Sequence, residues 1–502
     1  MAVTCAQVNP EKNTAGSPEL RYRRIGLLDH MGFGNMGDAA IHESFIQNIK
    51  KRLPEAHLIS FSQNPEDTSK RHNIACYPIE WRYPGCWNDS NKAQGAGPDR
   101  TSRFKSLLEK RCGSLYRVAR HARNLVRRVR HLKASYDVVK SLDLLVVAGG
   151  GQLCELWGGA WSHPYNVFTF CVLAKLANTP VVIVGVGADL LERGLSKLFA
   201  KWSVRLADYT SFRSVESQDK IRELGVKKDT HVCPDPAYAL DVQRYLVSDR
   251  PVALKTVEDQ GLTRNPINRA LGPEQCIAAD APRVPMLKVG LNPMGFCDPR
   301  VWPRKDSAAY ARYLDKLIRF STWLLAQNYS LELFTSDIVV DKFALDDLTE
   351  RLLGAVPPDV LYKVDCHPVS DLQELLFQMS EFDFVITPKF HGVVFSHLLG
   401  KPVIALSYLP KIDHLMRDVG DSQYCLEIGG FEADSLIKAF ASLVGSADDL
   451  VRLFGKTSAT YAEALEMEFD SLFGPLGVQA ANEVATENMA LRVRGRIAGR
   501  YF

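Results

Sequence analysis

The most constraining feature of this sequence is a repeated order: a short apolar run, a glycine-containing loop and an amphipathic helix. The first instance is the run 25–28, the loop MGFGNMGD and a helix that places Ile41, Phe45 and Ile49 on one face. A second apolar run, HLISFSQ at 57–63, follows that helix closely. The order strand, loop, helix, strand is typical of the start of a parallel sheet with helices on both faces.

The same alternation continues along the 502 residues and restarts after an irregular stretch. The runs 144–148 and 180–188 end at glycines, and further runs at 288–295, 329–336 and 383–390 alternate with helical segments. We therefore predict an α/β protein with two Rossmann-like domains and a ligand-binding cleft between them. The expected divisions are a disordered leader (1–20), an N-terminal Rossmann-like domain (21–240), a linker (241–285), a C-terminal Rossmann-like domain (286–450), and C-terminal helices with a basic tail (451–502).

A basic segment interrupts the first domain. Residues 103–133 contain eleven lysines and arginines and one acid, and apolar residues recur there at helical intervals. This pattern predicts a basic amphipathic helix with Gly113 as a candidate break. Two interpretations stay open: a helix packed on the protein with a solvated basic face, or a helix attracted to an anionic membrane surface.

The overall composition limits the classes of partner and cofactor. The formal net charge of +3 argues against nucleic acid as a partner. The 11 cysteines are scattered without a CxxC pair, which favours reduced thiols and no metal site. The sequence has no apolar signal segment and no run of roughly 18 apolar residues. We therefore expect a cytoplasmic protein, either free or peripheral to the inner face of the membrane.

Four segments, which together span most of residues 24–425, resemble the polysaccharide pyruvyl transferase family. They are GFGNMGDAAI, VVAGGGQL, SFRSVES with CPDPAYAL, and KFHGVVFSHLLGKPVIALSYLPKIDHLMRDVG. The last is the most specific, because it combines His-Gly at a strand-to-helix junction with Gly-Lys-Pro, an apolar strand, Tyr and Lys. The resemblance implies a GT-B-like fold, phosphoenolpyruvate as donor substrate, a glycan acceptor that is free or lipid-linked, and no cofactor.

The resemblance also implies an activity. The chain would be a transferase that moves a pyruvyl group to a sugar hydroxyl, forms a ketal and releases phosphate, in exopolysaccharide or cell-surface glycan synthesis. Two other interpretations stay open: a GT-B-type glycosyltransferase that uses a nucleotide sugar, and a non-catalytic family member that binds glycans. A nucleotide sugar needs a base-stacking pocket and ribose contacts, whereas phosphoenolpyruvate needs only a compact cationic pocket.

The family pattern places the donor and acid–base groups at strand ends that face the cleft. His391 is the candidate acid/base, because histidine titrates near neutral pH, and its alternative role is a structural residue at a helix start. Arg213, Lys389 and Lys411 are candidate cations for the donor or acceptor, with ordinary ion pairs as the alternative. Phe390 lies between two of these residues in the sequence and belongs to the same expected substrate site.

Two residues depart from the family pattern. Lys389 and Ser214 stand where the family usually has arginine and aspartate. Lysine keeps the positive charge but lacks the bidentate fork of arginine. We therefore expect the donor site to differ in its contacts from that of other members.

The glycine-rich loop is the second candidate binding element. Gly34 and Gly37 permit close approach of the backbone to a ligand. Asn35 and Asp38 could hydrogen-bond a substrate, and Asp38 could instead cap the helix that follows. The glycines match GxGxxG, but the next strand end offers only serines where a dinucleotide site needs an acid. We assign the loop to donor or acceptor binding.

A third glycine segment and one acid complete the candidates. Gly150 and Gly151 follow a buried apolar run, so their backbone amides could face a ligand or could simply form a tight turn. Asp235 lies between two prolines, a position that favours a structural role over a catalytic one.

Overall fold

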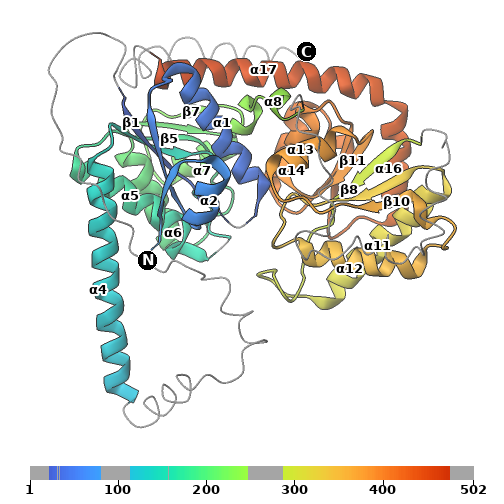
Figure 1. The fold of residues 1–502 in the computed structure, drawn as a ribbon, viewed down its shortest axis with the longest axis horizontal. Helices are drawn as coiled ribbons and strands as arrows, with labels where there is room; N and C mark the ends of the chain where they lie inside the picture. Colours follow the sequence, from blue (N-terminus) through green and yellow to red (C-terminus); the bar gives the residue numbers. More distant parts are fainter. Residues whose placement is uncertain are drawn as a thin grey trace.

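The computed structural model describes residues 22–30, 32, 34–80, 113–156, 158–246 and 286–474. Four parts of the predicted organisation lie outside these ranges: the leader (1–20), residues 103–112 of the basic helix, residues 247–285 of the linker and residues 475–502 of the tail. The described residues form two α/β domains bridged by a long C-terminal helix (Figure 1).

The N-terminal domain is built on a seven-stranded parallel sheet with strand order β3-β2-β1-β4-β5-β6-β7. Its strands are β1 (Arg24–Leu28), β2 (His57–Ser62), β3 (Ala75–Pro78), β4 (Leu144–Ala148), β5 (Val181–Val186), β6 (Tyr209–Phe212) and β7 (His231–Val232). Ile25 of β1 pairs with Leu58 on one side and with Leu144 on the other. The strand order reverses direction between β1 and β4, and sheets of this kind bind ligands at the carboxyl end of such a pair.

Right-handed crossovers place the helices of this domain on both faces of the sheet. One face carries α1 (Met36–Arg52) and α2 (Pro65–His72), and the other carries α4 (Gly113–Lys140), α5 (His163–Ala177), α6 (Gly194–Leu206) and α7 (Val215–Glu223). A short helix, α8 (Gln243–Leu246), ends the described part of the domain. The face with α4 to α6 buries a separate apolar core that contains Val139, Phe170 and Ala200.

The C-terminal domain repeats the same plan with a six-stranded parallel sheet in the order β10-β9-β8-β11-β12-β13. Its strands are β8 (Lys288–Leu291), β9 (Ser330–Leu333), β10 (Val364–Cys366), β11 (Phe384–Thr387), β12 (Val403–Ser407) and β13 (Cys425–Glu427). Its helices are α11 (Ser307–Ala326), α12 (Lys342–Ala355), α13 (Leu372–Ser380), α14 (Phe390–Leu398), α15 (Pro410–Val419) and α16 (Ala433–Gly445). The strand order reverses between β8 and β11, and a ligand site is expected at the carboxyl ends of these two strands.

The last described helix, α17 (Ala447–Phe473), runs along both domains (Figure 1). Its first half packs on α14 through Phe454, which lies 4.3 Å from the His397 ring. Its second half packs on the N-terminal domain, where Phe469 contacts Phe45 edge-on at 5.3 Å. The helix therefore ties the two sheets together through apolar contacts at both ends.

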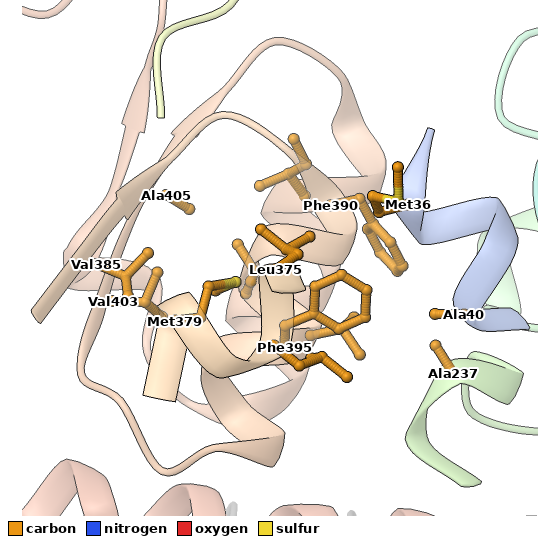
Figure 2. Close-up of a cluster of buried hydrophobic side chains, with 14 of the residues drawn as sticks. Met36, Ala40, Ala237, Leu375, Met379, Val385, Phe390, Phe395, Val403 and Ala405 are labelled. Atoms are coloured by element: carbon orange, nitrogen blue, oxygen red, sulfur yellow. The ribbon is translucent and has the colours of Figure 1, made fainter. Parts of the chain in front are cut away.

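The domains also share one continuous apolar core. Met36 and Ala40 of α1, together with Ala237, face Phe390 and Phe395 of α14 across the domain boundary (Figure 2). Burial of large aromatic side chains is among the strongest contributions to such an interface. The two domains are therefore in direct apolar contact beside the cleft, and the cleft between them is small.

The predicted architecture of two Rossmann-like domains is confirmed, and the differences are local. β3 was not predicted, because it is a four-residue edge strand that ends in proline and carries no clear alternation. The segment after residue 446 forms one 27-residue helix within the described part of the chain, where several helices were expected. No described helix combines the length and the apolar character that a membrane crossing requires.

The basic helix differs most from its prediction. It is expected over 103–133, and its described part, which starts at Gly113, continues past the expected end to Lys140. The extension follows from Val139, which is fully buried against the sheet. The alternative of a packed helix with a solvated face holds only near the C-terminal end, where Ser135 and Val139 are buried, because Leu125 and Val129 are 62% and 57% exposed.

Candidate functional site

A small cavity of about 50 Å³ opens in the cleft between the two domains, at the carboxyl edges of both sheets. Its lining comes from both domains and from α17. The N-terminal domain contributes Asp189, Arg213, Ser214, Pro234, Asp235 and Tyr238; the C-terminal domain contributes Phe390, Lys411, His414, Leu415 and Asp418; and α17 contributes Tyr461. Three of the predicted site residues, Arg213, Phe390 and Lys411, therefore lie around one cavity.

Arg213 follows β6 and is held by two carboxylates. Its guanidinium donates to Asp189 Oδ2 at 2.8 Å and to Asp235 Oδ2 at 3.0 Å. Burial alone would lower the pKa of Arg213, but Asp189 and Asp235 outweigh it and raise the pKa above its usual value. Gly187 leaves the room for this group, since a Cβ there would lie 2.6 Å from Nη2. The arginine is thus a fixed, permanently charged group in the cavity wall.

His391 lies in the first turn of α14, directly after β11, and its ring crosses toward the N-terminal domain. Its Nε2 lies 3.6 Å from Asp235 Oδ1 and is buried without a hydrogen-bond partner among the described residues. A side chain at Gly37 would overlap the imidazole. The candidate acid/base therefore lies between α1 of one domain and the Asp235 carboxylate, and it is not among the residues that line the cavity.

Asp235 connects the two candidates, a role that the sequence did not suggest. Its Oδ1 also accepts from the backbone amide of Ala237 at 3.0 Å, while Oδ2 accepts from Arg213. Burial would raise the pKa of Asp235, but His391, Arg213 and the Ala237 amide outweigh it and hold the pKa below its usual range. The ionised carboxylate faces an arginine of its own domain and the histidine of the other. These contacts give Asp235 a positioning role toward Arg213 and His391.

Lys389 is engaged elsewhere. It stands at the N-cap of α14, and its Nζ lies 2.5 Å from Asp341 Oδ2 and 3.4 Å from Asp337 Oδ2. Burial would lower the pKa of Lys389, but these two acids outweigh it and raise the pKa. Burial raises the pKa of Asp341 to about 6, against the lowering effect of Lys389. The structure thus surrounds Lys389 with acids of its own domain, and Lys389 does not line the cavity.

Phe390 and Lys411 form the other wall of the cavity. The Phe390 ring lies between two cations, with Arg213 Cζ 4.7 Å and Lys411 Nζ 5.5 Å from its centroid. Lys411 lies in the first turn of α15 and forms no ion pair with a described residue. Its charge is therefore available to an anion in the cavity, in contrast to that of Lys389.

The glycine-rich loop joins the domains. Gly34 O accepts from Ile338 N at 3.0 Å, and Met36 N donates to Ser336 O at 2.8 Å. Asn35 caps α1, because its Oδ1 accepts from the Gly37 amide at 2.9 Å. The suggestion that Asp38 caps this helix is therefore wrong; the cap is Asn35, which precedes the first turn. Gly34 and Asn35 use their polar groups at the domain junction.

Asp38 lies within electrostatic reach of His391 and Lys411 but is not among the residues that line the cavity. A Cβ at Gly150 would lie 3.8 Å from its Oδ1, which places the carboxyl beside the second glycine segment. Burial raises the pKa of Asp38, and the nearby charges of His391 and Lys411 only partly lower it. Gly150 itself has φ 68° and accepts from the Gly187 amide at 2.7 Å, while Gly151 O accepts from Cys154 N at 3.0 Å. Gly150 and Gly151 thus form a tight turn beside Asp38.

Asp29, His30 and Gln152 form a buried polar network next to the glycine-rich loop, and the sequence did not predict it. Asp29 Oδ1 accepts from Gln152 Nε2 at 2.7 Å, and Gln152 also contacts His30. Burial strongly raises the pKa of Asp29 and strongly lowers that of His30. The available sequence signal was that Asp29 and His30 directly follow β1, at the switch point of the sheet. Among the described residues, no group of histidine, cysteine and acidic side chains could hold a metal ion.

The fold and the cleft define a protein of the GT-B class, two Rossmann-like domains that bind ligands at facing sheet edges. The family model for polysaccharide pyruvyl transferase matches residues 35–410. The chain belongs to the polysaccharide pyruvyl transferase family, as the sequence motifs indicated. No curated protein matches the sequence.

Solved structures share the fold at low sequence identity. A protein described as a UDP-N-acetylglucosamine 2-epimerase from Listeria monocytogenes has a TM-score of 0.52 and 11% identity, over 91% of this chain and 99% of that chain. The UDP-GlcNAc 2-epimerase from Neisseria meningitidis has a TM-score of 0.49 and 11% identity, over 93% and 99% of the two chains. The Listeria likeness bears on the fold alone, and the Neisseria likeness is weaker.

Proposed function

We propose that the protein transfers a pyruvyl group from phosphoenolpyruvate to hydroxyls of a glycan and releases phosphate. The observation that carries this proposal is the pair of cations around Phe390. Arg213 and Lys411 come from different domains and face one small cavity, and Lys411 forms no salt bridge with a described residue, although the charges of Asp38 and Asp189 lie within its electrostatic reach. Asp189, Asp235 and Asp418 also line the cavity, and the first two hold Arg213. Lys411 and the outer face of Arg213 are therefore the groups that would bind a small donor with a carboxylate and a phosphate.

In this proposal the cations bind and orient the donor. Lys411 contacts one anionic group, and the outer face of Arg213 contacts the other, while Asp189 and Asp235 keep the guanidinium in place. Phe390 supplies an apolar floor between them. Lys389 positions the start of α14 through its ion pairs with Asp341 and Asp337, so it acts on His391 through the helix.

The reaction requires proton transfer in both directions. A proton adds to C3 of the donor, and C2 becomes an electron-poor centre that a sugar hydroxyl attacks as it loses its proton. Phosphate then leaves with the electrons of its C2–O bond. A second hydroxyl of the same sugar adds to C2 and loses its proton, which closes the ketal. One of the two hydroxyl protons thus replaces the proton that C3 gained, and the other balances the phosphate that is released.

His391 and Asp38 are the groups placed to carry these protons. His391 Nε2 lies 3.6 Å from Asp235 Oδ1, and burial raises the pKa of Asp38 above that of an ordinary aspartate. The ionised Asp235 would stabilise a positive charge on the imidazole. The chemistry needs no cofactor, because the donor itself carries the leaving group.

The test is phosphate release from phosphoenolpyruvate by the purified full chain, with a panel of free and lipid-linked glycans, beside His391→Ala. We expect acceptor-dependent release that the substitution lowers by at least about a hundredfold. A thermal shift with phosphoenolpyruvate but no release would place the acceptor outside the panel. Neither release nor a thermal shift would contradict the proposal and direct the search to nucleotide sugars or to glycan binding without turnover.

A further inference from the structure

The exposed part of α4 carries an apolar stripe that no described residue covers. Leu125, Val126 and Val129 are 62%, 48% and 57% exposed. Their spacing places them on one side of the helix, close to the face that points into the core at Val139, fourteen positions after Leu125. Figure 1 shows α4 extending from the layer of α5 and α6 well past the body of the domain. We call Leu125, Val126 and Val129 the α4 stripe.

Cations border this stripe. Arg123, Arg127 and Arg130 are exposed on the same turns of the helix, and none of them forms an ion pair with a described residue. The 28-residue sequence of α4 contains a single acid, Asp137. An apolar stripe bordered by unpaired arginines has the composition of helices that lie at a lipid–water interface.

A second helix of the same layer repeats the pattern independently. On α6, Leu195, Leu198 and Trp202 are 45%, 46% and 43% exposed and share one face. Lys197 and Arg205 are exposed on the same helix. Apolar groups exposed in this number, with a basic rim, mark an interaction surface more often than a chance surface.

Both helices reach the edge of the domain where the cleft lies. α5 packs against α4 on one side and against α6 on the other, so the three form one layer. Crossover helices run antiparallel to the strands of their sheet, so the N-terminal ends of α4 and α6 lie at its carboxyl edge. A surface bound through these helices would therefore lie near the mouth of the cleft.

We propose that α4 and α6 form a binding surface for a membrane that contains anionic lipids. Charge complementarity selects this occupant: the arginines attract lipid phosphates, and the apolar side chains enter the boundary between headgroups and acyl chains. A nucleic acid would satisfy the arginines and leave the leucines and valines in water. The inference goes beyond the transfer reaction and does not rest on it. A protein bound in this way would present its cleft to acceptors carried by lipids.

The test is co-sedimentation of the full chain with vesicles of phosphatidylcholine alone or mixed with phosphatidylglycerol. We expect binding to the anionic vesicles that falls as salt rises, because the arginine contribution is screened. Leu125→Asp with Val129→Asp, and separately Arg123→Glu with Arg127→Glu, should each lower the bound fraction by about tenfold or more. Val451→Asp and Lys456→Glu, which alter exposed positions on α17, should bind as the unaltered chain does.

Three results would overturn the inference: no binding of the unaltered chain to anionic vesicles, equal binding by the α4 variants, or equal loss in the α17 variants. Size-exclusion chromatography with light scattering tests whether the α4 stripe instead binds a second copy of the chain. A dimer that Leu125→Asp converts to a monomer, without vesicle binding, would assign the stripe to a second copy of the chain. Because vesicle binding is measured without any donor or acceptor, failure of the proposed reaction would leave its result unaffected.

Discussion

The imidazole of His391 occupies the space that a side chain at Gly37 would need. Gly37 lies in the first turn of α1 and has an ordinary negative φ, so its glycine is required for room and not for backbone conformation. The backbone of one domain thus contacts the candidate acid/base of the other. This contact fixes the position of the ring as long as the domains stay packed.

The first prediction follows from that contact. Gly37→Ala should displace the His391 ring and lower phosphate release by about a hundredfold, because a small misplacement of a catalytic group has a large effect on rate. Alanine favours a helix over glycine by about 1 kcal/mol, which offsets part of an overpacking cost of about 1–3 kcal/mol, so the thermal midpoint should fall only modestly. The measurement is turnover together with thermal unfolding. Gly455→Ala on α17 is the matched control, since no atom lies within 4 Å of a Cβ there. Equal turnover in both variants would contradict the prediction.

The second prediction concerns Asp235. Asp235→Asn removes a buried carboxylate from Arg213 and should lower the free energy of unfolding by about 3 kcal/mol near neutral pH. The pKa of this acid is held below its usual range, so its stabilising effect is complete above the unfolded pKa, roughly 4, and disappears as the pH falls further. Urea unfolding at several pH values checks this, with exposed Asp359→Asn as control. A difference that stayed constant down to the lowest pH would argue against the ion pair.

The third prediction separates the two lysines. Lys389→Ala leaves Asp341 and Asp337 buried without their counter-charge and should lower stability by about 3 kcal/mol. Lys411→Ala breaks no ion pair among the described residues and should leave stability unchanged, while it raises the KM for phosphoenolpyruvate by about tenfold. Thermal unfolding and steady-state kinetics of both variants test the assignment. The reverse pattern, with KM changed only by Lys389→Ala, would restore Lys389 as the donor cation.

The fourth prediction concerns Asp421, just after α15. Burial raises the pKa of this acid to about 6, and its Oδ2 has no hydrogen-bond partner among the described residues. Because the folded state holds the proton more tightly than the unfolded state, stability falls as the pH rises from about 4 to 6. Asp421→Asn should therefore stabilise the protein by about 1–2 kcal/mol at pH ~8 and have little effect at pH ~4. Denaturant midpoints at the two pH values decide the matter, and an equal effect at both would contradict it.

The architecture was predictable from the sequence because its signals are local. Buried parallel strands need continuous apolar runs such as 144–148, and the turns after them need glycines, so both leave a direct mark on the sequence. The positions of His391 and Arg213 at strand ends follow from the same marks. The short edge strand β3 left none, because four residues that end in proline look like a loop.

The partners of the charged residues were not predictable in the same way. The sequence shows that Lys389 carries a charge, but its counter-charges, Asp337 and Asp341, lie about 50 positions earlier, between another strand and its helix, and no local pattern links them to Lys389. Asp235 likewise meets His391 only when the domains pack together. Periodicity predicted an amphipathic α4 but could not say what covers its apolar side, because burial depends on where the helix leaves the domain.

The course of α17 has a consequence for synthesis of the chain. Phe469 of α17 packs edge-on against Phe45 of the first domain, and the Tyr209 hydroxyl donates to Glu468 at 3.0 Å. These partners are made more than 220 residues after the described part of the first domain is complete, which at 5–20 residues per second means a delay of roughly 10–45 s. During that interval the nascent first domain carries an open apolar groove, and a chaperone or the emerging second domain must shield it until the final helix arrives.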